Sequence, residues 1–356
     1  NGSFNNSSSP SIRKCTFRNN YASGGGAIGI DATAGGACRP SITGCRFENN
    51  TAALATTSFG GAILGVGSQG ANISPQISDC QFINNYSGHH GGALAFSLSG
   101  DQSRMGAFIA RCTFIGNEAT ERGGAIWSRM TTNAISSWIL GNSLFENNHA
   151  GAEGGAIYNR ISFDSQGDDQ ILTSIFRKNS TDKSGGAVYL RGSQGANSEV
   201  DVVHCTFDQN QSADKGGAVY KDADEFAPGS LETRILNCTF WQNEAMNSGG
   251  DVYLEQGGGQ LGFELHNSIL WEGSDPGIGS SNASGRVSHC ILQHPLPDDL
   301  IDGGNNFSED PVFADAAAGD FHPLRCSPAI DAGDNDALPL TINADRDGTP
   351  RNSNST

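Results

Sequence analysis

The chain has 356 residues, a length that suits one large or two medium-sized domains with a sizeable core. It contains 48 glycines, 36% hydrophobic residues and only 17% charged residues, which argues against a helical enzyme and against a charge-driven disordered chain. With 21 Lys and Arg against 38 Asp and Glu, the net charge is −17, so we expect no nucleic-acid partner. No apolar run approaches the roughly 20 residues that cross a bilayer, so no membrane insertion is expected.

A repeated unit runs through most of the chain. Cys15-Thr16-Phe17 is followed by Asn20 and by Gly25-Gly26-Ala27-Ile28, and the same succession returns seven times at steps of 30 to 35 residues. Constant spacing with variable insertions is typical of a solenoid whose loops lie on one side. The repeat phenylalanines are Phe17, Phe47, Phe82, Phe114, Phe145, Phe176, Phe207 and Phe240. The repeat asparagines are Asn20, Asn50, Asn85, Asn117, Asn148, Asn179, Asn210 and Asn243.

Short strands explain this repeat better than helices do. Apolar and polar residues alternate in segments such as Asp201-Val202-Val203, and a Gly pair in every repeat would break a helix. The leucines of leucine-rich repeats are missing, and tetratricopeptide or ankyrin units need helices. We therefore predict an all-β parallel β-helix over residues 1–294, with about ten coils of about 31 residues and three short strands per coil. Residues 295–356 are expected to form a loop-rich C-terminal cap.

Each repeated residue type has an expected place in such a coil. The Phe of every coil predicts an internal stack with rungs about 4.8 Å apart, and the Cys two residues earlier points to the same inward side. The Asn suits a turn, where its side chain can hydrogen-bond the backbone of its own and neighbouring coils. The Gly pair supplies a corner with positive φ or close backbone approach.

At these residues the chain resembles the repeat of the chlamydial polymorphic outer-membrane proteins and their bacterial relatives, with Phe-x-x-Asn followed by Gly-Gly-Ala and Ile, Val or Leu over residues 12–255. Residues 327–333 (Ser-Pro-Ala-Ile-Asp-Ala-Gly) and 345–351 resemble the end of large secreted, surface-anchored bacterial β-helix proteins. Because the anchor of such proteins is missing and the chain opens at Asn1, we expect a trimmed portion of a longer product. The resemblance implies a right-handed β-helix, secretion and an adhesin-like or scaffold role, with no shared catalytic residue.

Nine cysteines are present. Seven lie at or beside the Phe position, and we interpret them as buried thiols that serve as small hydrophobic residues. Since two copies carry Ser instead, no disulfide between coils is obligatory. Cys38 and Cys326 lie near opposite ends of a linear rod, beyond the roughly 7 Å limit for an internal bridge. One hypothesis is that they pair between protomers stacked end to end, and the alternative is two unpaired thiols or a Cys326 that folds back locally. Identical bands on reducing and non-reducing gels would contradict the pairing.

Pectate lyases and polygalacturonases also use the β-helix, with clustered carboxylates as calcium ligands or as catalytic acids. The candidates here are Asp168-Asp169, Asp298-Asp299, Asp222 with Asp224 and Glu225, and the run Gly88-His89-His90-Gly91. We interpret Asp168-Asp169 as a solvated loop, and the His pair as the approach to a repeat corner, since Gly91 is the first Gly of its pair. The acidic residues are not aligned from coil to coil, so no catalytic residue is predicted. A polysaccharide lyase or glycoside hydrolase is the alternative function.

The loops hold two further kinds of candidate site. Asp-rich C-terminal loops carry oxygen atoms of the kind that calcium binds, the alternative being Asx-turn capping, and no other cofactor is expected. A melting temperature that is unaffected by chelator would exclude calcium. The candidate calcium ligands are Asp331, Asp334, Asp336, Asp345 and Asp347. Among the Asn-x-Ser/Thr sequons, Asn72 and Asn282 lie in expected loops and are the better candidates for glycosylation.

A β-helix exposes unpaired backbone groups at its two ends, which natural solenoids cap or use. We therefore expect a secreted cell-surface or extracellular structural protein. Its partners are expected to be glycans of a host surface, bound by an adhesin-like stalk, or copies of itself stacked head to tail into a fibre. Concentration-dependent polymerisation would distinguish the fibre from the stalk.

Overall fold

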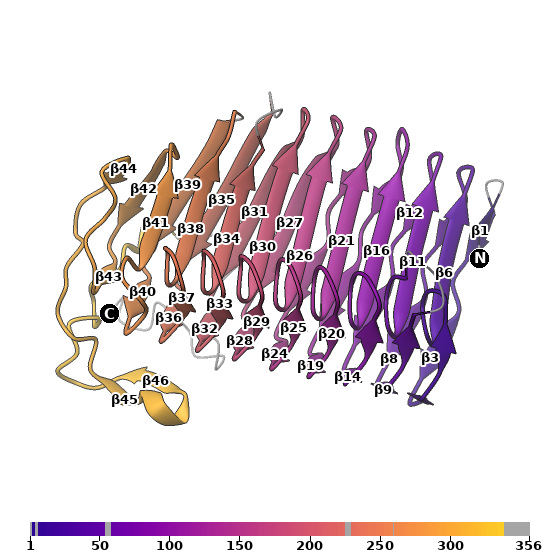
Figure 1. Cartoon of the computed structure of the whole chain (residues 1–356), viewed down its shortest axis with the longest axis horizontal. Helices are drawn as coiled ribbons and strands as arrows, with labels where there is room; N and C mark the ends of the chain where they lie inside the picture. The colour runs from indigo at the N-terminus through magenta and orange to yellow at the C-terminus, as the bar shows by residue number, and fades with distance from the viewer. Residues whose placement is uncertain (1, 4–5, 54–57, 225–228, 259, 338–356) are drawn as a thin grey trace, which may run out of the picture.

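The chain forms a single elongated parallel β-solenoid (Figure 1), seen in a computed structural model that describes residues 2–3, 6–53, 58–224, 229–258 and 260–337. Its strands stack into three long sheets, A, B and C, and one narrow sheet, D, all with parallel pairing. Among the described residues, no helix is long and apolar enough to cross a bilayer. The all-β parallel solenoid and its three main strands per coil are as predicted.

Sheets A and C each contain ten strands. Sheet A consists of β1 (Gly2–Ser3), β6 (Ile28–Thr33), β11 (Ile63–Ser68), β16 (Leu94–Ser99), β21 (Ile126–Thr131), β26 (Ile157–Ser162), β30 (Val188–Ser193), β34 (Val219–Ala223), β38 (Val252–Gln256) and β41 (Ile278–Ser281). Sheet C consists of β4 (Thr16–Arg18), β9 (Arg46–Glu48), β14 (Gln81–Ile83), β19 (Thr113–Ile115), β24 (Leu144–Glu146), β28 (Ile175–Arg177), β32 (Thr206–Asp208), β36 (Thr239–Trp241), β40 (Ile269–Trp271) and β43 (Ile291–Leu292).

Sheet B changes character along the rod. The first coils contribute two short strands each, the next four coils contribute one strand of seven residues, and the last two strands, β42 and β44, have four and three residues. Its strands are β2 (Ser7–Ser8), β3 (Ser11–Arg13), β7 (Ala37–Cys38), β8 (Ser41–Thr43), β12 (Asn72–Ile73), β13 (Gln76–Ser78), β17 (Arg104–Met105), β18 (Phe108–Ala110), β22 (Ile135–Ser136), β23 (Ile139–Gly141), β27 (Gln166–Leu172), β31 (Asn197–Val203), β35 (Ser230–Leu236), β39 (Gln260–His266), β42 (Gly285–Ser288) and β44 (Leu300–Asp302).

Sheet D is a row of two-residue strands at the corner between sheets C and A. Its strands are β5 (Tyr21–Ala22), β10 (Thr51–Ala52), β15 (Tyr86–Ser87), β20 (Glu118–Ala119), β25 (His149–Ala150), β29 (Ser180–Thr181), β33 (Gln211–Ser212) and β37 (Glu244–Ala245). A coil that contributes a strand to sheet D also contributes strands to the other three sheets, so we count it as a complete turn. The solenoid therefore has about eight complete turns. The prediction of about ten coils was therefore slightly high, since the decayed repeats after residue 255 form only partial coils.

The repeat phenylalanines form one continuous stack inside the solenoid. Neighbouring ring centroids lie 4.6 to 5.0 Å apart, and the ring planes are within 10° of parallel. Seven of the eight rings are fully buried, and Phe17 in the first coil is half-buried. The stack ends where Leu270 pairs in register with Phe240. The in-register strands thus place one aromatic rung in each coil at the strand spacing.

The repeat asparagines form a second internal row, the asparagine ladder. The Nδ2 group of Asn148 donates to Oδ1 of Asn179 in the next coil and to the backbone oxygen of Phe114 in the preceding coil, at 2.9 and 3.0 Å. The backbone N–H of Asn148 donates to the same Oδ1 of Asn179 at 3.1 Å. Each buried amide therefore forms hydrogen bonds to the coils on both sides of its own. These bonds join three coils and remove the cost of burying an unpaired polar group.

Asp251 ends this ladder. Asn243 has no asparagine in the following coil, and its Nδ2 donates instead to Oδ1 of Asp251 at 3.0 Å. Asp251 occupies the position at which the seven preceding copies have Ala. It is 1% exposed, and burial raises the pKa of its carboxyl group to about 7 against the opposing hydrogen bond from Asn243.

The Gly pairs form the corner between sheets D and A. Gly154 has φ +69°, in the left-handed region that glycine adopts without strain. A Cβ atom on Gly155 would lie 2.0 Å from the backbone oxygen of Gly186 in the next coil. The first glycine thus serves the turn, and the second permits close approach of coils.

The C-terminal segment folds back against the side of the solenoid (Figure 1). The antiparallel strands β45 (Phe313–Asp315) and β46 (Asp320–Pro323) flank the short 3-10 helix η1 (Ala316–Ala318), and the rings of Phe313 and Phe321 pack on Trp241 of sheet C. A second 3-10 helix, η2, spans Asn335–Ala337. Strand β44 still pairs with β42, so sheet B continues beyond residue 294, where the β-helix was predicted to end.

Candidate functional site

The outer face of sheet A carries three arginines in register, which we call the arginine ladder: Arg129 on β21, Arg160 on β26 and Arg191 on β30. Strand alternation turns the residues on either side of each arginine inward, so the three side chains share one face. All three are half-buried. Consecutive strands therefore place the three arginine residues in a row at backbone intervals of about 4.8 Å, on a chain whose net charge is −17.

The ladder is only partly neutralised. Arg191 forms ion pairs with Asp222 and Asp224 at 3.4 and 2.7 Å. Arg160 donates to the hydroxyl of Ser193 at 3.3 Å. The Nε atoms of Arg129, Arg160 and Arg191 are buried and make no hydrogen bond within the described part of the chain, although Nε of Arg191 is the atom that forms the ion pair with Asp222. Burial lowers the pKa of Arg160, and the neighbouring charges of Arg191 and Arg129 act in the same direction.

An aromatic row runs beside the ladder, two residues earlier on each strand. It consists of Trp127, Tyr158, Tyr189, Tyr220 and Tyr253. These side chains are 2 to 6% exposed, so the row does not present open ring faces to solvent. The guanidinium of Arg122 lies 5.6 Å from the ring centroid of Tyr158, a distance at which a cation–π attraction operates. The row therefore forms a packed wall along the arginine ladder.

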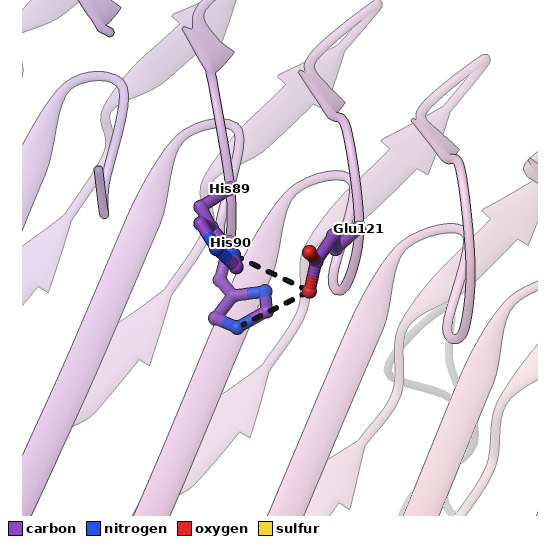
Figure 2. A group of neighbouring side chains, drawn as sticks. All are labelled: His89, His90 and Glu121. Carbon is purple, nitrogen blue, oxygen red and sulfur yellow. Dashed lines mark ion pairs between the residues drawn. The ribbon is translucent and has the colours of Figure 1, made fainter. Parts of the chain in front are cut away.

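A second group of polar side chains lies at the corner between sheets D and A (Figure 2). His89 and His90 lie in the connection from β15 to β16, and Glu121 lies in the connection from β20 to β21. His89 Nδ1 is 3.3 Å from Glu121 Oε2, and His90 Nε2 is 3.8 Å from the same oxygen. Within the described ranges, this is the only group of three or more His, Cys, Asp or Glu side chains close enough to hold one metal ion.

Aromatic packing fixes the imidazole of His90. Its ring lies 4.9 Å from Trp127 in a stacked arrangement and 5.3 Å from Phe59. Burial lowers the pKa of His90 to about 3, and the charges of His89 and Arg122 act in the same direction. The ring is therefore neutral at neutral pH, which leaves a nitrogen lone pair free for coordination.

The acidic candidates for catalysis do not converge. Asp169 was interpreted as part of a solvated loop, and this was wrong: it is fully buried in β27, where it accepts hydrogen bonds from Ser136, the Trp138 N–H and Asn159. The seven-residue strand β27 replaces the expected loop and turns Asp169 inward. Burial raises its pKa to about 6. Asp169 thus serves the interior of the solenoid, while Asp168 is exposed.

The other acidic candidates lie apart from one another. Asp298 and Asp299 are exposed at the C-terminal end. Asp222 and Asp224 pair with Arg191 on sheet A, and Glu225 lies outside the described residues. Asp222 is aligned with Glu255 of the next coil, and Asp168, Glu199 and Glu232 are aligned across three coils of sheet B. The prediction that acidic residues are not aligned between coils was therefore wrong at these positions.

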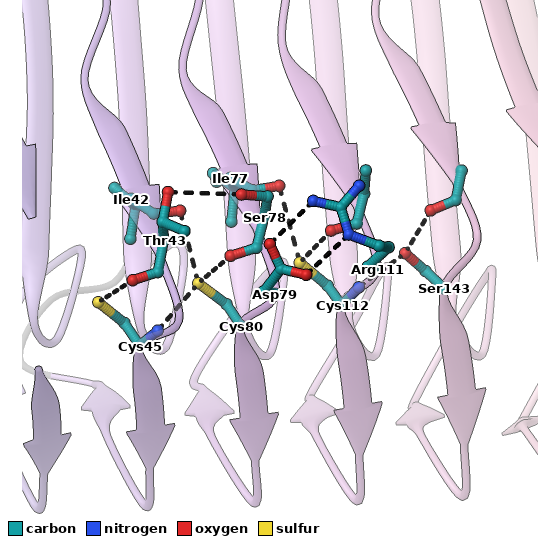
Figure 3. A network of polar contacts seen from close by, with 12 residues as sticks. Ile42, Thr43, Cys45, Ile77, Ser78, Asp79, Cys80, Arg111, Cys112 and Ser143 are labelled. Atoms are coloured by element: carbon teal, nitrogen blue, oxygen red, sulfur yellow. Dashed lines mark hydrogen bonds and ion pairs between the residues drawn. The ribbon is translucent and has the colours of Figure 1, made fainter. Parts of the chain in front are cut away.

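The cysteines that lie two residues before the repeat phenylalanines form a hydrogen-bonded row, shown in part in Figure 3. The Cys80 thiol donates to the backbone oxygen of Ser78 at 3.1 Å and accepts the N–H of Cys45 at 3.4 Å. Ser143 takes the same role with its hydroxyl, which accepts the N–H of Cys112 at 3.1 Å. Burial raises the pKa of Cys45 and raises that of Cys290 to about 12, so these thiols remain protonated at neutral pH.

The structure does not bring Cys38 and Cys326 together. Both are free thiols. Cys38 is 2% exposed in β7 and donates to the backbone oxygen of Asp31 at 3.0 Å, whereas Cys326 is exposed in the C-terminal segment. The intermolecular disulfide stays a prediction, and burial of Cys38 argues against it. Head-to-tail stacking likewise stays a prediction.

The predicted calcium and glycosylation sites are loop features. Asp331, Asp334 and Asp336 are partly or fully exposed and do not form a three-residue cluster among the described residues. Asp345 and Asp347 lie outside the described residues. The predicted glycosylation sites, half-buried Asn72 on β12 and exposed Asn282 with φ +55°, also stay predictions.

Sequence reasoning missed the arginine ladder and the partner of the His pair, although both had a signal. When the copies are aligned on their Gly pairs, Arg129, Arg160 and Arg191 fall at one position. The same alignment places His89 and Glu121 at one position, two residues before the Gly pair. Residues at one repeat position lie side by side in a solenoid, so the alignment predicts both groups.

The fold and the repeated residues together define a repeat parallel β-solenoid, and the comparisons with known proteins agree with this repeat. Five segments match the family model of the Chlamydia polymorphic membrane protein repeat, at residues 14–31, 44–66, 111–129, 142–160 and 204–221. That family is associated with the outer membrane and cell surface. The chain therefore carries repeats of the polymorphic membrane protein type, as its sequence suggested. No curated protein and no solved structure matches the chain.

Proposed function

We propose that this chain is a non-catalytic, cell-surface β-solenoid that binds an anionic glycan along the arginine ladder. The observation that carries the proposal is the in-register row of Arg129, Arg160 and Arg191, in which the buried Nε atoms of Arg129 and Arg160 make no hydrogen bond within the described residues. Like charges on neighbouring strands destabilise a sheet. Arg191 already has Asp222 and Asp224 as partners, so an external anion would offset this cost chiefly at Arg129 and Arg160.

The geometry of the row favours a linear polymer with regularly placed anionic groups. Guanidinium groups bind carboxylates and sulfates through paired hydrogen bonds, and the ladder offers them along one line. The net charge of −17 repels polyanions elsewhere on the surface. In the next two coils the position aligned with the arginine ladder is occupied by the acidic residues Asp222 and Glu255. The stretch that attracts anions therefore spans three coils. The surface association of the repeat family supports a glycan as the partner.

The polysaccharide-cleaving alternative has less support. Acid catalysis of glycoside cleavage needs two carboxyl groups facing one bond, and the acidic residues first considered for it are either buried, ion-paired or apart. A binding role needs no such pair. The adhesin-like role is thus the function that the outer face of sheet A supports best.

Binding to acidic polysaccharides tests the proposal. We expect the protein to bind a sulfated glycosaminoglycan or polygalacturonate but not neutral dextran, with affinity that falls as salt rises. The double variant Arg129→Gln/Arg160→Gln is expected to weaken binding at least tenfold, because each charge-assisted contact contributes about 1.5–3 kcal/mol. Arg191 is kept intact, since its removal would leave Asp222 and Asp224 unpaired.

Arg104→Gln is the matched control, because Arg104 is an exposed arginine on sheet B, away from the ladder. It is expected to bind as the unmodified protein does, and melting temperatures verify that all variants fold. Equal affinity of the double variant and the control would refute the ladder as the binding site. No binding of either anionic polymer by the unmodified protein would refute the proposed ligand class.

A further inference from the structure

We propose that His89, His90 and Glu121 form a binding site for a divalent transition-metal ion of the zinc type, which links two neighbouring coils. The site is separate from the proposed glycan-binding function, since none of its three residues belongs to the arginine ladder. It is built by the coil repeat: the backbone N–H of Glu121 donates to the backbone oxygen of His89 at 2.9 Å, which sets the two loops in register.

The distances fit a tetrahedral shell. Bonds of 2.0–2.2 Å to imidazole nitrogen and carboxylate oxygen place two ligand atoms about 3.4 Å apart. His89 Nδ1 and Glu121 Oε2 are 3.3 Å apart, and His90 Nε2 is 3.8 Å from the same oxygen. The three ligand atoms lie within 4.8 Å of one another. A small side-chain rotation would therefore bring all three to one ion, and Figure 2 shows both rings facing the carboxylate.

One ring nitrogen of each histidine also lacks a hydrogen bond within the described residues. Nδ1 of His89 is buried and makes no hydrogen bond to any described residue, although it lies near the Glu121 carboxylate. A buried donor or acceptor without a hydrogen bond is unfavourable, and coordination of an ion by Nδ1 would remove that cost at His89. The ring of His90 is held by packing against Phe59 and Trp127, because its Nδ1 makes no hydrogen bond within the described residues. In this position its Nε2 lies 3.8 Å from Glu121 Oε2.

The surrounding charges set limits on the ion. Arg122 lies 3.5 Å from the Glu121 carboxylate and also pairs with Glu153, and Arg129 lies close enough to act on His90. These arginines disfavour a cation held by charge alone, as calcium is. Two imidazoles and one carboxylate instead suit zinc, nickel or copper, which form directional bonds to nitrogen. Glu121 is partly exposed, so the remaining coordination position is open to water.

Such an ion would bind the folded solenoid and not the unfolded chain, because the ligands come from two coils. Binding then raises the melting temperature by mass action. It would also hold together the β15–β16 and β20–β21 connections at the edge of the aromatic row. The ion thus acts as a cross-link between coils, with an open position that an external ligand can occupy.

Calorimetric titration with Zn²⁺ alone tests the site. The exposed thiols of Cys15 and Cys326 are first replaced by Ser, since thiolates also bind zinc. In this background we expect one equivalent of Zn²⁺ to bind and to raise the melting temperature, while Ca²⁺ and Mg²⁺ do neither. His89→Ala and Glu121→Gln are each expected to lower the affinity at least tenfold.

Glu118→Gln is the matched control, because Glu118 is an exposed carboxylate three residues from Glu121 on the same turn. Melting temperatures in the presence of chelator show whether the variants fold, and Co²⁺ absorption reports tetrahedral coordination independently of affinity. The proposal is overturned if the background protein binds no stoichiometric Zn²⁺, or if His89→Ala and Glu121→Gln bind it as tightly as Glu118→Gln does.

Discussion

Asp251 shows how one side chain can end a repeating network. In earlier coils, the Nδ2 group of each ladder asparagine donates to the Oδ1 of the asparagine that follows. Asn243 has no such neighbour, and the carboxyl oxygen of Asp251 takes its place. Asp in place of the usual Ala therefore gives the buried amide of Asn243 a hydrogen-bond acceptor, at the cost of burying an ionisable group.

This arrangement predicts a dependence of stability on pH. Burial raises the pKa of Asp251 from its unfolded value near 3.8 to about 7, so the folded state binds the proton more tightly. The contribution of this group to the free energy of unfolding is then largest below about pH 4, falls as the pH rises to about 7, and is constant above it. Asp251→Asn keeps the acceptor oxygen and removes the titration, so its stability relative to the unmodified protein should rise over this interval by a few kcal/mol.

Urea unfolding at a series of pH values measures this difference. Asp298→Asn, which changes an exposed carboxylate, serves as the control and should show the pH profile of the unmodified protein. A constant stability difference between Asp251→Asn and the unmodified protein from pH 4 to pH 8 would contradict a raised pKa at Asp251.

At the scale of the elements, close contact between coils depends on the second glycine of each pair. A Cβ atom on Gly155 would lie 2.0 Å from the oxygen of Gly186 and 2.5 Å from that of Ser180. Both contacts are with backbone atoms, which cannot move without disturbing the adjacent coil. Gly155→Ala is therefore expected to lower the free energy of unfolding by about 2–4 kcal/mol.

Gly141→Ala is the control for this prediction. A Cβ atom there meets nothing closer than 3.8 Å, and Ala110 already occupies the aligned position in the preceding coil. Because alanine also reduces the freedom of the unfolded chain, this variant should be neutral or more stable by up to about 1 kcal/mol. Chemical denaturation compares the two, and equal stabilities would exclude the close approach.

The elements also show which parts of the fold could be predicted. The Phe, Asn and Gly-pair positions recur with nearly constant spacing, so the parallel solenoid and its internal stacks followed from the sequence. The burial of Asp169 did not follow from the sequence, because it depends on whether residues 166–172 form a loop or one long strand. The partnership of His89 with Glu121 required the exact register of two neighbouring corners, and only alignment on the Gly pairs exposes it.

At the scale of the whole molecule, each coil contacts mainly the coils on either side. The ring of Phe145 is stacked on both faces and fully buried, whereas Phe17 is stacked only on Phe47 and is half-buried. In such a linear array, stability is a sum of coil and interface terms, so an end coil can open without the rest.

This linear architecture predicts different effects for two equivalent substitutions. Phe145→Ala should lower the free energy of global unfolding by about 3–5 kcal/mol, the usual range for a buried aromatic ring. Phe17→Ala should leave the global transition nearly unchanged and instead speed hydrogen exchange in β4 and β5. Denaturant unfolding and hydrogen exchange measure the two effects separately. An equal loss of global stability in both variants would indicate a fully cooperative rod instead.

The asparagine ladder gives the solenoid a dipole along its long axis. From Asn20 to Asn210, each side-chain amide donates to the Oδ1 of the asparagine in the following coil, and Asn243 donates to the Oδ1 of Asp251. Eight amide dipoles thus point the same way in a dry interior, where they add as peptide dipoles do along a helix. The positive end of this column falls at Asp251, the one place where the repeat exchanges alanine for an acid.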